Sequence, residues 1–90
     1  MTVEEYARTA DLPGFVLHNN RYFCLNGNYL ISVFKNDIPL EGGIPSLDVT
    51  VDELSSEFFF DQNLEWETCV TYASVTKTIQ RFCKKYFTKK

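Results

Sequence analysis

Residues 21–35 limit what this chain can fold into more than any other stretch, because two alternating apolar runs meet there at Asn26-Gly27. Asn-Gly between such runs is the strongest short-range signal of a β-hairpin, since both residues accept the positive φ of a type I′ turn. We therefore predict two antiparallel strands with Asn26 and Gly27 as the loop. This register places Tyr22 opposite Ile31.

A second turn at Asn19-Asn20 extends the hairpin to a three-stranded meander, with residues 14–18 as its first strand. Both faces of this meander are apolar. One face carries Val16, Phe23, Leu25, Leu30 and Phe34, and the other carries Phe15, Leu17, Tyr22, Cys24, Tyr29, Ile31 and Val33. A sheet that is apolar on both sides needs two covers, one from the core of the domain and one from a terminal segment or a partner.

Length and composition indicate one globular domain over residues 1–90, with 44% hydrophobic and 16% aromatic residues. The three cysteines Cys24, Cys69 and Cys83 are odd in number and lack CxxC spacing, which favours reduced thiols in a core over disulfides. No metal and no cofactor are expected. Apolar runs are too short to span a bilayer and no basic-then-apolar leader follows Met1, so we expect a cytoplasmic protein.

The chain divides into three parts. Residues 1–13 form an N-terminal extension, in which the capping-box spacing of Thr2 and Glu5 predicts a helix over 3–10. Residues 14–73 hold the strands. Beyond the meander we expect strands at 47–51, 57–61 and 64–72, with a turn at Gln62-Asn63. In the strand over 57–61, we expect Phe58 and Phe60 to point inward and Phe59 to point outward. An amphipathic C-terminal helix over 74–87, capped by Ser74, completes the domain.

Charge is divided unevenly along the chain. Residues 1–67 contain twelve acidic and three basic residues, a net charge of -9, and residues 68–90 contain six basic residues and no acid. A basic C-terminal helix attracts phosphates of nucleic acid or lipid headgroups. The same residues also complement the negative end of the helix macrodipole, which is the simpler interpretation.

The order of the short motifs over residues 14–87 resembles a pleckstrin homology domain. The segments similar to the first four strands of that family are Gly14-Phe15-Val16-Leu17, Arg21-Tyr22-Phe23-Cys24-Leu25, Leu30-Ile31-Ser32-Val33-Phe34-Lys35 and Gly43-Ile44-Pro45-Ser46-Leu47. Tyr72-Ala73-Ser74 resembles the strand-to-helix junction, and Phe82 stands where the family helix usually has Trp. The resemblance implies a mainly β fold, a small, partly open antiparallel barrel or sandwich of about seven short strands capped by the C-terminal helix. The alternative is an α+β fold, a three-stranded meander packed by helices.

The resemblance also implies which face is interior. Val16, Phe23, Leu25, Leu30 and Phe34 would fill the barrel together with Phe58, Phe60, Trp66, Val70, Tyr72, Ile79 and Phe82. The opposite face, Tyr22, Tyr29, Ile31 and Val33, is then either an interaction surface, with Phe59 beside it, or covered by the helix over 3–10. With no catalytic constellation in the sequence, we expect no enzyme and no small-molecule substrate, but a protein-interaction module that acts as an adaptor, inhibitor or assembly subunit.

Phosphate binding is the alternative function. In pleckstrin homology domains, phosphoinositides bind near the first two strands, where this chain has His18 and Arg21, with Lys35 as a helper from the third strand. The basic residues of the C-terminal helix are Lys77, Arg81, Lys84 and Lys85. The expected partner is therefore another protein or a second copy of the chain, and in the alternative an anionic membrane or a nucleic acid, whose binding would weaken with salt.

Overall fold

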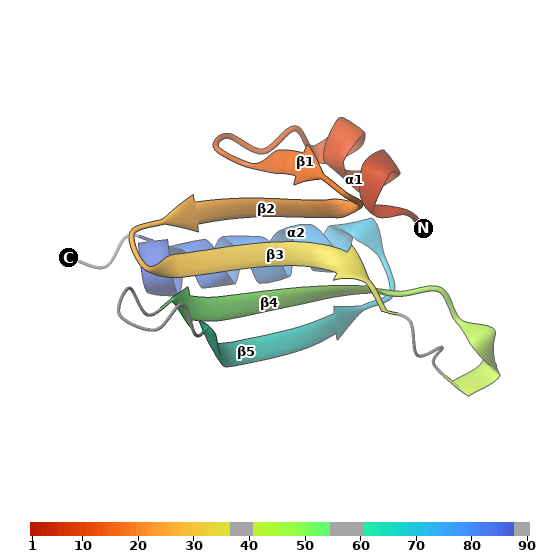
Figure 1. Ribbon diagram of the computed structural model, residues 1–90. Helices are drawn as coiled ribbons and strands as arrows, with labels where there is room; N and C mark the ends of the chain where they lie inside the picture. Colours follow the sequence, from red (N-terminus) through yellow and green to blue (C-terminus); the bar gives the residue numbers. More distant parts are fainter. Residues whose placement is uncertain (37–40, 55–60, 88–90) are drawn as a thin grey trace.

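The computed structural model describes residues 1–36, 41–54 and 61–87. The elements in chain order are helix α1 (Val3–Ala10), strands β1 (Val16–His18), β2 (Arg21–Asn26) and β3 (Tyr29–Lys35), the 3-10 turn η1 (Glu41–Gly43), strands β4 (Leu47–Leu54) and β5 (Asp61–Cys69), helix α2 (Tyr72–Phe82) and the π-helical turn η2 (Cys83–Phe87). The five strands form one antiparallel sheet in the order β1-β2-β3-β4-β5 (Figure 1). The fold is mainly β, as predicted, but the sheet is open and about seven strands was an overestimate.

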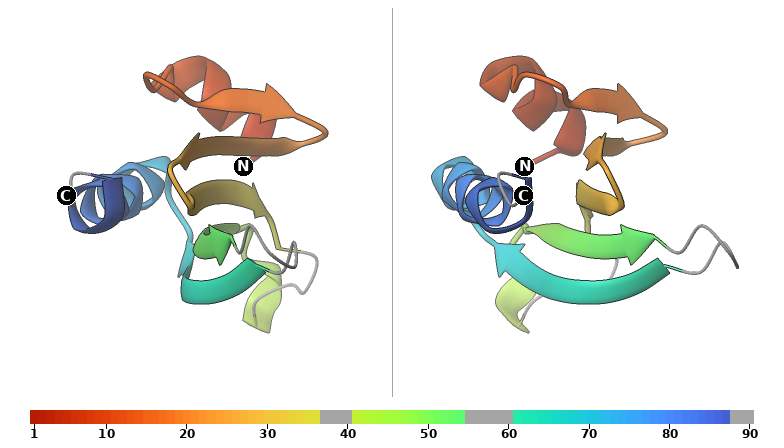
Figure 2. Two further views of the ribbon diagram at one scale, coloured as in Figure 1. Left: turned by 60° about the vertical axis from the view of Figure 1, so that its left-hand side comes forward. Right: turned by 90° about the vertical axis from the view of Figure 1, so that its left-hand side faces the viewer.

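Both helices lie on the same side of the sheet, as the two views of Figure 2 show. We call this side the inner face; its core residues are Tyr22, Ile31, Val33, Leu47, Val49, Val51 and Cys69. Val75, Ile79 and Phe82 of α2 and Val3, Tyr6 and Ala7 of α1 are buried against them. At about 25 cal/mol per Å² of apolar area removed from water, this contact between helices and sheet is the main source of stability.

The outer face is the other side of the sheet. It consists of Val16, His18, Arg21, Phe23, Leu25, Leu30, Ser32, Phe34, Asp48, Thr50, Asp52, Trp66 and Thr68. The structure thus reverses the predicted sides. The predicted interaction residues Ile31 and Val33 are fully buried, Tyr22 is 4% exposed, and the residues of the meander predicted to be interior lie on the outer face.

The reason for the reversal lies in strand β4. It continues the inner face with Leu47, Val49 and Val51 and the outer face with the polar side chains Asp48 and Thr50. Only the face with Leu47, Val49 and Val51 offers α2 an apolar surface of sufficient size, so the helix packs on that face. Of the two predicted roles for the face that holds Tyr22, the structure shows the covered one: the rings of Tyr6 in α1 and Tyr22 in β2 meet edge to face, with centroids 6.0 Å apart.

The φ angles of the turn residues identify the types of the two turns in the meander. Asn19 and Asn20 have φ of 51° and 62°, as a type I′ turn requires, and the predicted pairing of Val16 with Phe23 is confirmed. In the hairpin, however, Asn26 pairs with Tyr29, so the loop is Gly27-Asn28 and the predicted register was wrong. Gly27 has φ of 62° and Asn28 has no positive φ, which is the pattern of a type II′ turn with Gly first. The register moves by two residues, so every side chain keeps its face.

A threonine caps the N-terminus of each helix. The Thr2 hydroxyl accepts a hydrogen bond from the Glu5 N–H at 3.0 Å, which confirms the predicted start of α1. Helix α2 begins earlier than predicted, because Thr71 and not Ser74 is its N-cap: the Ser74 N–H donates to the Thr71 hydroxyl at 3.1 Å. Tyr72, predicted to end a strand, therefore belongs to the helix.

Strand β5 begins before its predicted start. Gln62 and Asn63, predicted as a turn, pair with Glu53 and Asp52 of β4. Leu64 is left over as a bulge, and the Asn63 side chain fills the gap by donating to the Val51 carbonyl at 3.4 Å. Most of the predicted strand 57–61, with Phe58, Phe59 and Phe60, lies outside the described residues. Within residues 1–36, 41–54 and 61–87, neither helix has the length and apolar character of a membrane span.

Candidate functional site

The outer face exposes large apolar side chains from three strands. Val16 of β1 is 53% exposed, Leu25 of β2 is 55% exposed, and Trp66 of β5 is 57% exposed. Phe23 and Leu30 lie between them and are half-buried. In the described part of the chain, both helices pack on the inner face and leave these side chains exposed on the outer one, with polar Ser32 and Thr50 between Phe23 and Trp66.

An aromatic cluster with one cation orders this surface. The Arg21 guanidinium lies over the Phe34 ring, 5.1 Å from its centroid. The rings of Phe34 and Trp66 meet edge to face, with centroids 5.5 Å apart and planes at 82°. Such contacts are attractive because the ring face carries negative and the ring edge positive partial charge. Side chains from β2, β3 and β5 are thereby held in one arrangement across the sheet.

Asp48 fixes the position of Trp66. Its carboxylate is fully buried and accepts a hydrogen bond from Trp66 Nε1 at 2.8 Å and a longer one from Asn36 Nδ2 at 3.4 Å. Hydrogen bonds to an ionised acceptor are stronger than neutral ones, so the indole ring is anchored although more than half of it is exposed. An anchored aromatic ring loses little conformational entropy when a partner covers it.

The centre of the outer face is built from small polar residues. Ser32 of β3 and Thr50 of β4 are neighbours there, and both are buried. The Ser32 hydroxyl has no hydrogen-bond partner in the described part of the chain. Because Ser32 and Thr50 are buried, a partner of this face would contact the larger side chains around them, among them Phe23 and Trp66.

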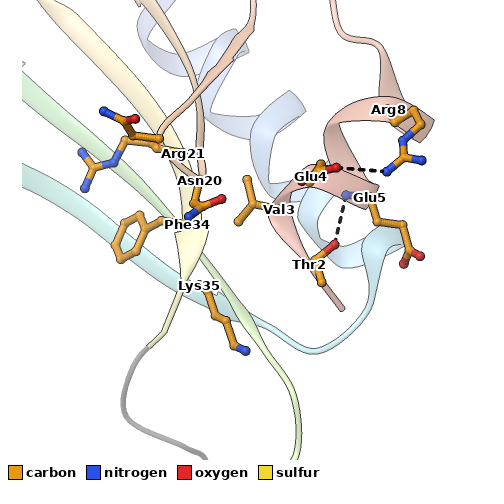
Figure 3. A pocket seen from close by; sticks show the side chains of 10 residues that line it. Thr2, Val3, Glu4, Glu5, Arg8, Asn20, Arg21, Phe34 and Lys35 are labelled. Carbon is orange, nitrogen blue, oxygen red and sulfur yellow. Dashed lines mark hydrogen bonds and ion pairs between the residues drawn. The ribbon is translucent and has the colours of Figure 1, made fainter.

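A second candidate site is a pocket of about 610 Å³ between the start of α1 and the ends of β2 and β3 (Figure 3). Arg21 and Lys35, two of the residues predicted to bind phosphate, line it; His18 does not. Glu4 and Glu5 also line it, and Glu4 already pairs with Arg8 at 3.5 Å. The pocket is therefore of mixed charge, and two carboxylates oppose the binding of a polyanion.

The basic helix is largely paired with the strand beside it. Arg81 contacts Glu67 at 2.8 Å and Lys85 contacts Glu65 at 3.0 Å. The Tyr86 hydroxyl also donates to Glu65 at 2.6 Å, and these hydrogen bonds, first from Tyr86 and then from Lys85, lower the pKa of the Glu65 carboxyl. Two of the four basic residues that the C-terminal helix was predicted to offer to phosphate are thus paired with carboxylates within the molecule.

The structure also separates the predicted phosphate-binding residues. Arg21 and Lys35 lie at one pocket, whereas Lys77, Arg81, Lys84 and Lys85 follow α2 and η2. Across the described ranges, no single surface combines the two groups. Lys77 and Lys84 are exposed on the helix, but they are too few to form the several charge-assisted bonds that a phosphate cluster needs.

The cysteines are packing residues. Burial is the main cause that raises the pKa of the thiols of Cys24, Cys69 and Cys83, which keeps them protonated at neutral pH. Cys69 also lies 3.5 Å from the Thr78 hydroxyl. Among the described residues, no three His, Cys, Asp or Glu side chains are grouped to hold a metal ion.

The sequence analysis missed Trp66 and Asp48 as site residues. The signal that could have found them is the alternation in β4, where Asp48 is polar on the face that Phe34 occupies in β3. A buried carboxylate on that face needs a donor, and the only Trp in the chain is a natural candidate.

We compared the chain with models of protein families, with curated proteins and with solved structures, and none of the three comparisons found a match.

Proposed function

We propose that this protein is a non-catalytic protein-interaction module that binds its partner through the outer face of the sheet. One observation carries the proposal: Val16, Leu25 and Trp66 are each more than half exposed, and all three lie on the same side of the sheet. Contiguous exposed apolar surface on a small protein marks an interaction site. Trp, Phe and Arg are also the residues most often found as energetic anchors at interfaces.

We also propose that the module is of pleckstrin homology type. A meander of antiparallel strands followed by an amphipathic C-terminal helix supports it, while the departures are the open sheet and the side on which the helix packs. An adaptor, inhibitor or assembly subunit is consistent with a binding surface that consists of a sheet face.

The test is photo-crosslinking in a cell extract with a benzophenone side chain at position 25. The matched control carries the same group at Leu17, which is 43% exposed but pairs with Tyr22 and so belongs to the opposite side of the sheet. We expect protein adducts from position 25 that excess unlabelled wild type suppresses and excess Leu25→Glu does not. Equal adducts from both positions, or none from position 25, would contradict the proposal.

Phosphate binding is the second candidate, and the observation that favours it is that Arg21 and Lys35 line one pocket (Figure 3). The test is sedimentation with vesicles of anionic lipid at low and moderate salt, with the double variant Arg21→Gln, Lys35→Gln. Phosphate binding at this pocket predicts salt-sensitive sedimentation that the double variant loses. A double variant that sediments like wild type excludes the pocket as a phosphate site.

A further inference from the structure

We infer that the outer face binds a second copy of this chain in a two-fold interface, in which Arg21 of each copy meets Asp52 of the other. The inference rests on the proposed function, since it names the partner of the same surface. Three features of the outer face support it: the positions of its charged residues, the pattern of apolar residues between them, and the small residues at its centre.

Apart from the buried Asp48, which accepts from Trp66, the basic residues of the outer face lie at one corner and Asp52 at the opposite one. His18 of β1 and Arg21 of β2 are opposite each other in the strand register, at one corner of the face, and both are exposed. Asp52 lies in β4 in the row that also contains Leu25 and Leu30, at the other end of the strands. It is half-buried, and one of its carboxylate oxygens accepts from Asn63 Nδ2 at 3.1 Å, which leaves the other oxygen for Arg21 of the second copy. A surface with a basic corner and an acidic corner is complementary to a copy of itself turned over, which is what an isologous interface requires.

A two-fold axis in the plane of the interface, running diagonally across the strands, exchanges these two corners. Under this operation the strands of the two sheets cross at a steep angle, which is the orthogonal class of sheet packing, roughly 90°. The apolar corner of Val16, Phe23, Leu25 and Leu30 then faces the same corner of the second copy. Trp66 faces the region of Phe34 in that copy, so aromatic surface covers aromatic surface.

The centre of the face suits close packing of two sheets. Packed sheets lie about 10 Å apart, with side chains of both filling the space between them. Ser32 and Thr50 occupy the centre and are small, while the larger side chains stand around them. Ser32 and Thr50 are themselves buried, so two such faces would meet through the exposed side chains around this centre, with Val16, Leu25 and Trp66 the large apolar ones.

Nucleic acid is a less suitable occupant, although exposed aromatic rings on a sheet also stack on bases. The outer face offers Arg21 and His18 but also Asp52, and the chain as a whole has a net charge of -3. A surface that follows a phosphate backbone needs several cations in line, and this face has them at one corner only.

The experiment measures self-association of the full chain by sedimentation equilibrium from micromolar to millimolar concentration. Trp66 is the only Trp in the chain, so its emission reports directly on the outer face. We expect a monomer–dimer equilibrium accompanied by a blue shift of Trp66 emission. Arg21→Glu and Asp52→Arg should each weaken the dimer by about tenfold or more, because each places like charges together.

The decisive measurement uses a mixture of the two charge-reversal variants, Arg21→Glu and Asp52→Arg. In the mixed dimer the substituted glutamate of one copy would face the substituted arginine of the other, and the remaining native Asp52 and Arg21 would also face each other. The mixture should therefore associate about as tightly as wild type. A folding defect in either variant cannot be rescued by mixing, so rescue isolates the contact. Lys77→Glu is the matched control: it reverses an exposed charge on α2, away from the outer face, and should leave the dimer unchanged.

Several results would overturn the inference: a monomer at every concentration, a dimer that both reversals leave intact, or singly weakened variants whose mixture fails to associate. Quenching of Trp66 by single-stranded DNA that competes with self-association would identify nucleic acid as the occupant instead. A monomer that still yields crosslinks from position 25 to another protein refutes the second copy and retains the proposed function. A monomer without such crosslinks refutes both.

Discussion

Asp48 shows how one buried carboxylate organises an exposed face. It is fully buried and accepts from Trp66 Nε1 at 2.8 Å, so Asp48→Ala removes a charge-assisted hydrogen bond and leaves the indole without its anchor. We expect a loss of about 2 kcal/mol in the free energy of unfolding, and about half of that for Asp48→Asn, which keeps one acceptor oxygen. Urea unfolding gives both values, and lower anisotropy of Trp66 fluorescence in Asp48→Ala reports the released ring. An unchanged anisotropy would contradict the anchoring role.

The contacts of Glu65 make the free energy of unfolding depend on pH. Its pKa lies below the ordinary value of 4.5, first because the Tyr86 hydroxyl and then because the Lys85 ammonium donates to it. A carboxyl whose pKa is lower in the folded state stabilises the fold above its unfolded pKa, and this contribution is lost as pH falls through the folded pKa. Wild type should therefore lose more stability than Glu65→Gln between neutral pH and pH of about 3. Tyr86→Phe should show an intermediate loss; three parallel curves of unfolding free energy against pH would exclude this role of Glu65.

At the scale of elements, α1 depends on its cap. Thr2 accepts from the Glu5 N–H at 3.0 Å, its own N–H donates to the Tyr72 hydroxyl at 3.0 Å, and that hydroxyl donates to the Glu5 carboxylate. Thr2→Ala removes the cap and should cost about 1 kcal/mol. Amide hydrogen exchange should accelerate in α1 before it does in β3 and β4. Thr2→Ser keeps the hydroxyl and is the control; equal exchange in the two variants would show that the cap contributes nothing.

At the scale of the whole molecule, the two faces of the sheet should respond oppositely to the same substitution. Ile31 is fully buried on the inner face and Leu25 is 55% exposed on the outer face. Ile31→Glu would bury an unpaired charge and should prevent folding, whereas Leu25→Glu should cost less than about 1 kcal/mol. Circular dichroism and thermal unfolding of the two variants test this directly. If Ile31→Glu folded and Leu25→Glu did not, the buried face would be the one that the sequence analysis predicted, with Leu25 inside and Ile31 outside.

Local patterns were sufficient for much of the architecture. The N-cap at Thr2, the turn at Asn19-Asn20 and the alternation in β4 each depend on residues within a few positions of one another, and all three were predicted correctly. The second half of the predicted capping box is not formed, because the Thr2 N–H donates to the Tyr72 hydroxyl and not to Glu5. The predicted hairpin loop was wrong by one position because Asn-Gly fits both a type I′ turn and the start of a type II′ turn. The candidate site was predicted less well, since Trp66 and Phe34 meet only across two strand pairings.

The sequence by itself determined that a meander with two apolar faces precedes an amphipathic helix, because the period of two and the period of 3.6 are local properties of the chain. It could not determine which face the helices cover. That choice depends on β4, which brings Leu47, Val49 and Val51 beside β3 on one side and Asp48 and Thr50 on the other. Only the tertiary structure decided it, because burial is a property of segments that are distant in the chain and adjacent in space.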